Sequence, residues 1–77
     1  MGTMKKFVVD ANMREDLDTI ILRFDLEENR QHSADDLREG ERVILHEPGD
    51  FECQAIVRRG IHDRWVAKII DETIVYL

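Results

Sequence analysis

The sequence predicts a mainly β, or all-β, domain: a small antiparallel barrel of five or six strands, or a curled sheet, with one short helical turn near residues 34–39. Apolar and polar residues alternate between positions 41 and 70, and a strand with one buried face has a period of two residues. Two turn signals, Pro48-Gly49 and Gly60, separate the alternating runs. A length of 77 residues is also too short for two packed sheets of full size.

The first third of the chain predicts two strands joined by a loop. The first strand is residues 5–11, with one face formed by Phe7, Val9 and Ala11. Polar, turn-forming residues predict a loop at residues 12–18. The second strand is residues 19–24, because a short run rich in β-branched and aromatic residues favours a strand over a helix. Its predicted inward residues are Ile20, Leu22 and Phe24, and its outward residues are Thr19, Ile21 and Arg23.

The polar segment 25–32 predicts a second loop, which leads into a short helix at residues 34–39. Ser33 stands where a side chain would cap the first turn, and acidic residues follow it, as suits the positive end of the helix dipole. Gly40 stands where a helix ends in a residue of positive φ. A helix of this length is not stable alone, so we expect its apolar residue, Leu37, to pack over an open end of the sheet.

The second half of the chain predicts a series of strands joined by hairpin turns. These strands are residues 42–46, 51–58 and 64–70, and residues 73–77 form a further short strand or a 3₁₀ turn followed by one. Proline presets φ and glycine accepts positive φ, so Pro48-Gly49 fits the centre of a type II turn. The predicted inward residues are Val43, Leu45, Phe51, Cys53, Ala55, Val57, Trp65, Ala67 and Ile69.

The residues that lead into the first of these strands form a pattern also seen in other small β proteins. In the run LREGERVIL at residues 37–45, a glycine and two polar residues lead into a strand that begins with valine. This pattern resembles the entry common in SH3-like barrels, in which a strand–turn–strand–turn–strand core and a short 3₁₀ element follow. The resemblance covers residues 37–77 and implies a small barrel fold. Because such barrels carry many unrelated functions, it implies no activity and no site residue.

Composition limits the class of protein. We expect a single domain at residues 4–77, with residues 1–3 as a cloning remnant, because Met4 is a second candidate initiator. Cys53 is the one cysteine and no signal peptide is visible, which predicts a reducing, cytoplasmic location. The apolar runs are too short to cross a membrane. The formal net charge of −6 argues against general binding to nucleic acid, which attracts basic surfaces.

No group of residues predicts a reaction, a metal site or a cofactor, and we expect a non-enzymatic protein. Metal-type ligands occur near one turn, at His46, Glu47, Asp50 and Cys53. The strand phase places Cys53 inward and His46 outward, so these ligands do not converge on one ion. The acidic segment 10–18 lacks the glycine and the terminal glutamate of a calcium loop. A nucleophilic cysteine needs a base and a partly exposed setting, and the strand phase buries Cys53.

Apolar residues at outward strand positions predict a partner-binding surface. These positions should be polar in a sheet with one solvated face. They include Val8, Ile21, Ile44, Ile56, Val66 and Ile70. One short helix anchored by Leu37 is too small to cover all of them. We therefore expect a protein-interaction or regulatory module that self-associates as a homodimer, or docks another protein, through this surface.

Two alternatives rest on charged residues. The first is binding of RNA or DNA through the basic residues around the Gly60 hairpin, which are Arg58, Arg59, Arg64 and Lys68. The second is an acidic mimic of nucleic acid, formed by the segment 10–28, that blocks a basic protein site. Changing Asp16, Asp18, Glu27 and Glu28 to amides should then abolish binding to basic partners. Trp65 shares its strand phase with Ala67, so we expect it in the core rather than as a stacking platform for a base.

Overall fold

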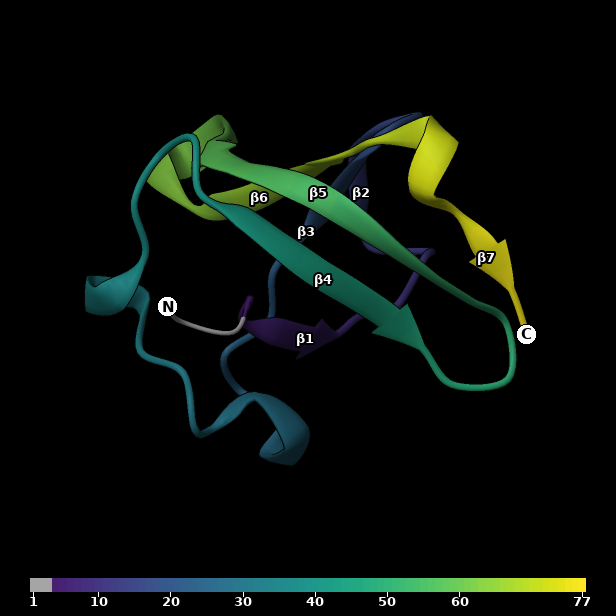
Figure 1. The fold of residues 1–77 in the computed structure, drawn as a ribbon. Helices are drawn as coiled ribbons and strands as arrows, with labels where there is room; N and C mark the ends of the chain where they lie inside the picture. Colours follow the sequence, from purple (N-terminus) through teal and green to yellow (C-terminus); the bar gives the residue numbers. More distant parts are fainter. Residues whose placement is uncertain (1–3) are drawn as a thin grey trace.

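The computed structural model describes residues 4–77, and the expected remnant at residues 1–3 lies outside the described residues. Seven strands form one sheet, and short 3₁₀ turns lie between them (Figure 1). The strands are β1 (Lys6–Val8), β2 (Arg14–Asp16), β3 (Thr19–Ile21), β4 (Arg42–Glu47), β5 (Phe51–Arg59), β6 (Trp65–Ile69) and β7 (Val75–Tyr76). Their order is β1-β4-β5-β6-β3-β2, and β7 pairs with β5 beyond the end of β6.

The fold is mainly β, as predicted, and its sheet curls without closing into a barrel. Of the two predicted forms, a barrel or a curled sheet, the structure has the curled sheet, because β1 and β2 end the strand order and do not pair with each other. The structure confirms a small β domain, and no more of the SH3-like resemblance than that. The open sheet leaves edges at β1 and β2, the ends of the strand order, and at β7, which pairs with β5 alone. How these edges are covered affects both stability and partner binding.

The centre of the sheet is the antiparallel meander β4–β5–β6, which the alternation predicts. Leu45 stands opposite Cys53 across β4 and β5, and Val57 stands opposite Ala67 across β5 and β6. Inward residues thus meet inward residues across both pairs, which is the contact that stabilises a sheet. Gly49 adopts φ +77° in the β4–β5 turn, as its place in the sequence predicts.

β1 and β2, at the two ends of the strand order, differ from the sequence prediction. β1 runs parallel to β4, with Phe7 opposite Leu45, although the prediction was an antiparallel fold throughout. β2 lies within residues 12–18, where the sequence predicts a loop. Its residues carry no apolar alternation, and pairing with β3 rather than a buried face holds it in the sheet.

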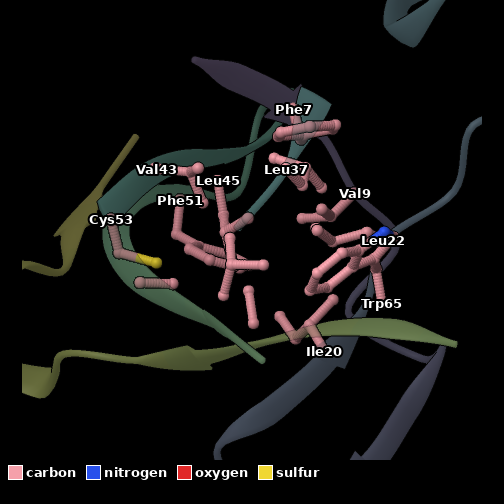
Figure 2. Close-up of a cluster of buried hydrophobic side chains, with 13 residues drawn as sticks. Phe7, Val9, Ile20, Leu22, Leu37, Val43, Leu45, Phe51, Cys53 and Trp65 are labelled. Carbon is pink, nitrogen blue, oxygen red and sulfur yellow. The ribbon is translucent and has the colours of Figure 1, made fainter. Parts of the chain in front are cut away.

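The core fills the concave side of the curled sheet. In Figure 2, side chains from strands on facing sides of the curl converge on one cluster. The buried members are Phe7, Val9, Ile20, Leu22, Leu37, Val43, Leu45, Phe51, Cys53, Ala55, Val57, Trp65 and Ala67. Ala11, Phe24, Ile69 and Ile74 are partly buried and pack against them. The predicted inward positions are thus confirmed, with Ile69 and Phe24 at the margin of the core.

The polar groups of two buried side chains, Trp65 and Thr19, are hydrogen-bonded within the protein. Trp65 is 7% exposed, and its Nε1–H donates a hydrogen bond of 2.9 Å to the Ala34 carbonyl, so it is a core residue as predicted. Thr19 is 1% exposed although its strand phase predicts an outward position, and its hydroxyl donates to the Asp18 carboxylate at 3.1 Å. This hydrogen bond offsets the cost of burying a hydroxyl.

Two 3₁₀ turns stand where the sequence predicts helical structure, and the helix predicted at residues 34–39 is shortened to one such turn. This turn, η2 (Ala34–Asp36), follows Ser33, whose hydroxyl accepts a hydrogen bond from the Asp35 backbone N–H at 3.2 Å. Leu37 is buried directly after this turn, as predicted. Another turn, η4 (Asp71–Thr73), precedes β7, which is the second of the two predicted alternatives. No helix within residues 4–77 is long and apolar enough to span a membrane.

The free edge of β1 is covered by the segment that contains the turn η1 (Glu27–Asn29). The Asn29 side chain is fully buried, accepts a hydrogen bond from the Val8 N–H at 2.8 Å and donates one to the Val8 carbonyl at 2.8 Å. Farther along the same edge, Nε2 of His32 lies 2.8 Å from the Lys6 carbonyl. Side chains therefore occupy edge groups that would otherwise be open to a strand of another molecule.

The edge at β2 is covered in a similar way. The Arg14 guanidinium donates hydrogen bonds to the backbone carbonyls of Ala11 and Leu17, which flank this strand. A long cationic side chain on an edge strand discourages pairing with another strand. The two ends of the strand order are thus both covered, which disfavours the addition of a foreign β-strand at β1 or β2.

The Glu15 side chain joins β2 to the β5–β6 turn. Its carboxylate accepts hydrogen bonds from the Ile61 N–H at 2.8 Å and from Nε of Arg64 at 3.0 Å. It approaches Gly60 so closely that an added Cβ would lie 2.5 Å from Glu15 Oε1. A side chain at position 60 would therefore push the Glu15 carboxylate away from its present place and from its hydrogen bonds with Ile61 and Arg64.

Candidate functional site

The outward side chains of the strands form rows across the convex side of the sheet. Residues opposite each other in an antiparallel pair share a face. One row holds Arg42, Ile56 and Lys68. The next row holds Arg58, Val66 and Ile21. We call this surface the outer face, and its main members are Lys6, Val8, Ile21, Arg42, Ile44, His46, Glu52, Gln54, Ile56, Arg58, Val66 and Lys68.

The structure places most of the predicted partner-binding residues where a partner would reach them. Those that are partly exposed are Val8, Ile21, Ile44, Ile56 and Ile70. Val66 is a correction, because its side chain is fully buried. β6 has a strand on each side, and Val66 is flanked by the longer side chains of Ile21 and Arg58. Its burial therefore depends on neighbours in other strands, and Val66 cannot contribute exposed area to the outer face.

A hollow of about 190 Å³ opens on the outer face beside the C-terminal segment. It is lined by Ile44, Glu52, Cys53, Gln54, Thr73 and Val75. The Thr73 hydroxyl accepts a hydrogen bond from the Gln54 N–H at 2.8 Å, which holds η4 against β5. Val75 is 60% exposed at the rim. The hollow thus offers apolar surface that a bound side chain would remove from water.

Cations surround these apolar residues. The cations of the outer face are Lys6, Arg42, Arg58 and Lys68. Lys6 pairs with Glu52 at 3.3 Å, and Lys68 lies 3.9 Å from Asp18. Arg58 makes no ion pair with any residue between positions 4 and 77. Among the outer-face residues these four cations stand against one carboxylate, Glu52, so this face is locally positive on a chain whose net charge is −6.

The predicted basic group at the β5–β6 hairpin is divided by the structure. Arg64 pairs with Glu15 at 3.0 Å. The Arg59 guanidinium lies 3.9 Å from the centroid of the Trp65 ring, within the range of a cation–π contact. These two cations stabilise the hairpin and its link to β2. The remaining members of the group, Arg58 and Lys68, lie on the outer face.

The carboxylates of the predicted nucleic-acid mimic lie on separate elements. Asp16 and Asp18 belong to the β2–β3 hairpin. Glu27 and Glu28 belong to η1, which packs against β1. β1 and β2 are the two ends of the strand order. The structure therefore does not bring the four carboxylates together within one element.

Cys53 and His46, the side chains considered above for nucleophilic or metal chemistry, lie on opposite faces of the sheet. Cys53 is 2% exposed, and burial raises the pKa of its thiol to about 11, so the thiolate that would act as a nucleophile is scarce at neutral pH. His46 lies on the opposite face, as the strand phase predicts, with Nδ1 3.1 Å from the Glu52 carboxylate. Within the described part of the chain, no group of three His, Cys, Asp or Glu side chains could hold a metal ion.

Two cations of the outer face, Lys6 and Arg42, are not among the predicted basic residues, although strand phase could have identified them. Lys6 precedes the buried Phe7 and Arg42 precedes the buried Val43, so the strand phase places both cations outward. The pairing of Glu15 with the β5–β6 turn has no local signal, because it joins segments far apart in the chain. Neither a protein-family model, nor a curated protein, nor a solved structure matches this chain, so its function is inferred from the geometry alone.

Proposed function

We propose that the chain is a non-enzymatic protein-interaction module that docks an acidic surface of another protein on its outer face. One observation carries this proposal: Ile56 stands in one row between Arg42 and Lys68. The neighbouring hollow is lined by Ile44 and the exposed Val75. Apolar residues at the centre with charged residues around them are typical of protein–protein interfaces. The complementary partner would present apolar side chains ringed by carboxylates.

A protein partner is favoured over nucleic acid by the position of the aromatic residues. Single-stranded nucleic acid binds by stacking its bases on exposed aromatic rings. Phe7, Phe51 and Trp65 are buried in the core, and Phe24 packs against it. Tyr76 is exposed but belongs to β7, outside the rows of the outer face. Two cations of the hairpin are also engaged within the protein, which weakens the case for a phosphate-binding hairpin.

The expected self-association is an alternative occupant of the same surface. Two copies docked outer face to outer face would bring the cations Arg58 and Lys68 of one copy toward those of the other. Like charges across an interface are unfavourable, so this geometry supports a foreign partner more than a second copy. The SH3-like resemblance stays a fold-level prediction and adds nothing to this choice.

The first test is the solution mass over a range of protein concentrations, by sedimentation at low and at high salt. We expect a monomer under both conditions. A dimer that persists at high salt and dissociates in the Ile56→Asp variant would mean that the apolar part of the outer face closes a self-interface. That result would overturn the proposal of a foreign partner in favour of a homodimer.

The second test compares two probes by NMR titration of the isotope-labelled chain. One probe is a capped peptide of alternating leucine and glutamate, and the other is a single-stranded oligonucleotide. We expect the peptide to shift the amide signals of Ile44 and Ile56, and to bind about tenfold more weakly to an Arg58→Glu, Lys68→Glu double variant. The Arg30→Glu variant changes a cation outside the outer face and should bind normally. Oligonucleotide binding without peptide binding would refute the protein partner.

A further inference from the structure

A second cavity, of about 250 Å³, opens where the β2–β3 turn, the β4–β5 turn and the C-terminal segment meet. Its floor is apolar, because Phe51 belongs to the core and Ile69 and Ile74 pack against that core. Leu17 and Tyr76 line the cavity and are 86% and 77% exposed. Two large side chains so exposed beside one cavity form apolar surface that a ligand would cover.

Carboxylates line the same cavity. Asp18, Asp50 and Asp71 are among its lining residues. Arg14 is the cation of the lining, but its guanidinium donates to backbone carbonyls of the neighbouring loop. The pKa of Glu47 is raised, chiefly by its hydrogen bond with Asp50, which reflects the crowding of negative charge at this end of the sheet. A ligand for the cavity therefore needs an apolar part and a positive charge.

We propose that this cavity binds an arginine side chain presented by a flexible segment of a partner protein. The aliphatic stem would lie on the apolar floor, and the guanidinium would lie among the carboxylates of Asp18, Asp50 and Asp71. A volume of about 250 Å³ is below the range typical of cofactor and drug sites, but suits a single long side chain. A negative lining disfavours phosphates and carboxylates.

Arginine fits these features better than lysine. Its planar guanidinium can donate two parallel hydrogen bonds to one carboxylate, whereas an ammonium group acts as a point charge. Guanidinium groups also stack on aromatic rings, and Tyr76 places an exposed ring at the rim. The Asp18 carboxylate can still accept hydrogen bonds from a guanidinium, because its ion pair with Lys68, at 3.9 Å, is weak.

This site goes beyond the proposed docking on the outer face. None of the residues that line the cavity is a member of the outer face as defined above. Lys68 of the outer face lies 3.9 Å from Asp18 of the cavity, so the single variants Arg58→Glu and Asp71→Asn, away from this pair, separate the two surfaces. Either proposal can then fail without the other. A chain with both sites would bind an acidic surface and a basic segment at once, which is the behaviour of an adaptor between two partners.

The binding test uses a matched pair of capped tripeptides, Leu-Arg-Leu and Leu-Gln-Leu, titrated into the isotope-labelled chain at low salt. We expect the arginine peptide to give saturable shifts of the amide signals of Leu17, Ile69 and Tyr76. The glutamine peptide should bind about tenfold more weakly or worse, because a charge-assisted hydrogen bond is worth more than a neutral one. Equal binding of the two peptides, or shifts confined to Ile44 and Ile56, would overturn the proposal.

Variants separate this cavity from a general electrostatic effect. The Asp18→Asn, Asp71→Asn pair should weaken the arginine peptide about tenfold, and Tyr76→Ala should weaken it several-fold with little effect on the fold, since this side chain is largely exposed. A Glu28→Gln, Glu39→Gln pair removes the same charge from exposed positions elsewhere and should bind as the wild type does. Unchanged binding in the aspartate pair, or equal loss in both pairs, would refute the site.

Discussion

Replacing Asn29 with alanine should remove a large part of the stability of this fold. The side chain is fully buried and makes three hydrogen bonds to backbone groups. It accepts from the Val8 N–H at 2.8 Å and donates to the carbonyls of Val8 and Arg23 at 2.8 Å and 2.7 Å. Alanine makes none of these bonds, so the Val8 N–H and the carbonyls of Val8 and Arg23 lose their partner together.

The magnitude follows from the number of groups left without a partner. A hydrogen bond contributes roughly 1 kcal/mol to stability, and a buried group left unpaired costs about 1–3 kcal/mol. For the three groups around Asn29 we expect a loss of about 3 kcal/mol in the free energy of unfolding. A domain of 77 residues has roughly 4–12 kcal/mol in total. The variant would therefore be folded but easily denatured.

Urea denaturation followed by Trp65 fluorescence measures this loss. The matched control is Glu28→Ala, an exposed residue of the same turn, which should change the unfolding free energy by less than about 0.5 kcal/mol. Asn29→Asp keeps the acceptor but faces two carbonyls, so its carboxyl should have a raised pKa and its stability should fall as the pH rises. A loss below about 1 kcal/mol in Asn29→Ala would show that water satisfies this edge, and would refute the reasoning.

Three further predictions concern other contacts. Gly60→Ala should cost about 1–2 kcal/mol in unfolding free energy because its Cβ meets the Glu15 carboxylate, and a double-mutant cycle with Glu15→Ala should recover most of that cost. Cys53, with a thiol pKa of about 11, should react with iodoacetamide far more slowly in the native protein than in urea, as mass spectrometry would show; rapid native labelling would contradict its burial. Lys5 Nζ donates a hydrogen bond of 2.6 Å to the Glu41 carboxylate and lowers the pKa of that carboxyl. The pair therefore adds its full amount to the unfolding free energy at pH values above the pKa of Glu41 in the unfolded chain. This stabilisation is lost as the pH falls through the lower pKa of Glu41 in the folded protein. The unfolding free energies of wild type and Glu41→Gln should converge in acid, and a constant difference would count against the pair.

The central strands could be predicted because each has one buried and one solvated face. Phe51, Cys53 and Val57 alternate with polar or half-exposed residues, and that local pattern is enough to define strand and phase. The turn at Gly49 could be predicted because its backbone conformation depends on the residue itself.

Pairing between distant segments could not be predicted in the same way. The parallel pairing of β1 with β4 depends on the closure of a long connection and has no local signature. Asn29 stands in a polar run that predicts an exposed loop, yet it is buried because three backbone groups need its amide. Polarity indicates what a side chain can bond to, and the fold decides whether the partner is water or protein.

The outer face could be predicted in part from the sequence and the cavity could not, because strand phase is local and the cavity joins distant segments. Ile44 and Ile56 on the outer face could be predicted from strand phase alone, whereas the burial of Val66 depends on Ile21 and Arg58 in neighbouring strands. The cavity is assembled from loops and strands that are separated along the chain, so no local pattern connects its lining residues.

The strand order also sets an order of events in folding. Within the meander, partners such as Val57 and Ala67 are close in sequence, whereas Phe7 must find Leu45 and Ile20 must find Ala67 over long stretches of chain. Closing a long loop costs entropy before its contacts form, so we expect the meander to be the nucleus. In a φ-value analysis Val57→Ala should slow folding and Phe7→Leu should mainly speed unfolding; the reverse would place the nucleus elsewhere. The edge at β1 and the β2–β3 hairpin would then order last and open first, so hydrogen exchange at these two edges should report partial unfolding before the core exchanges.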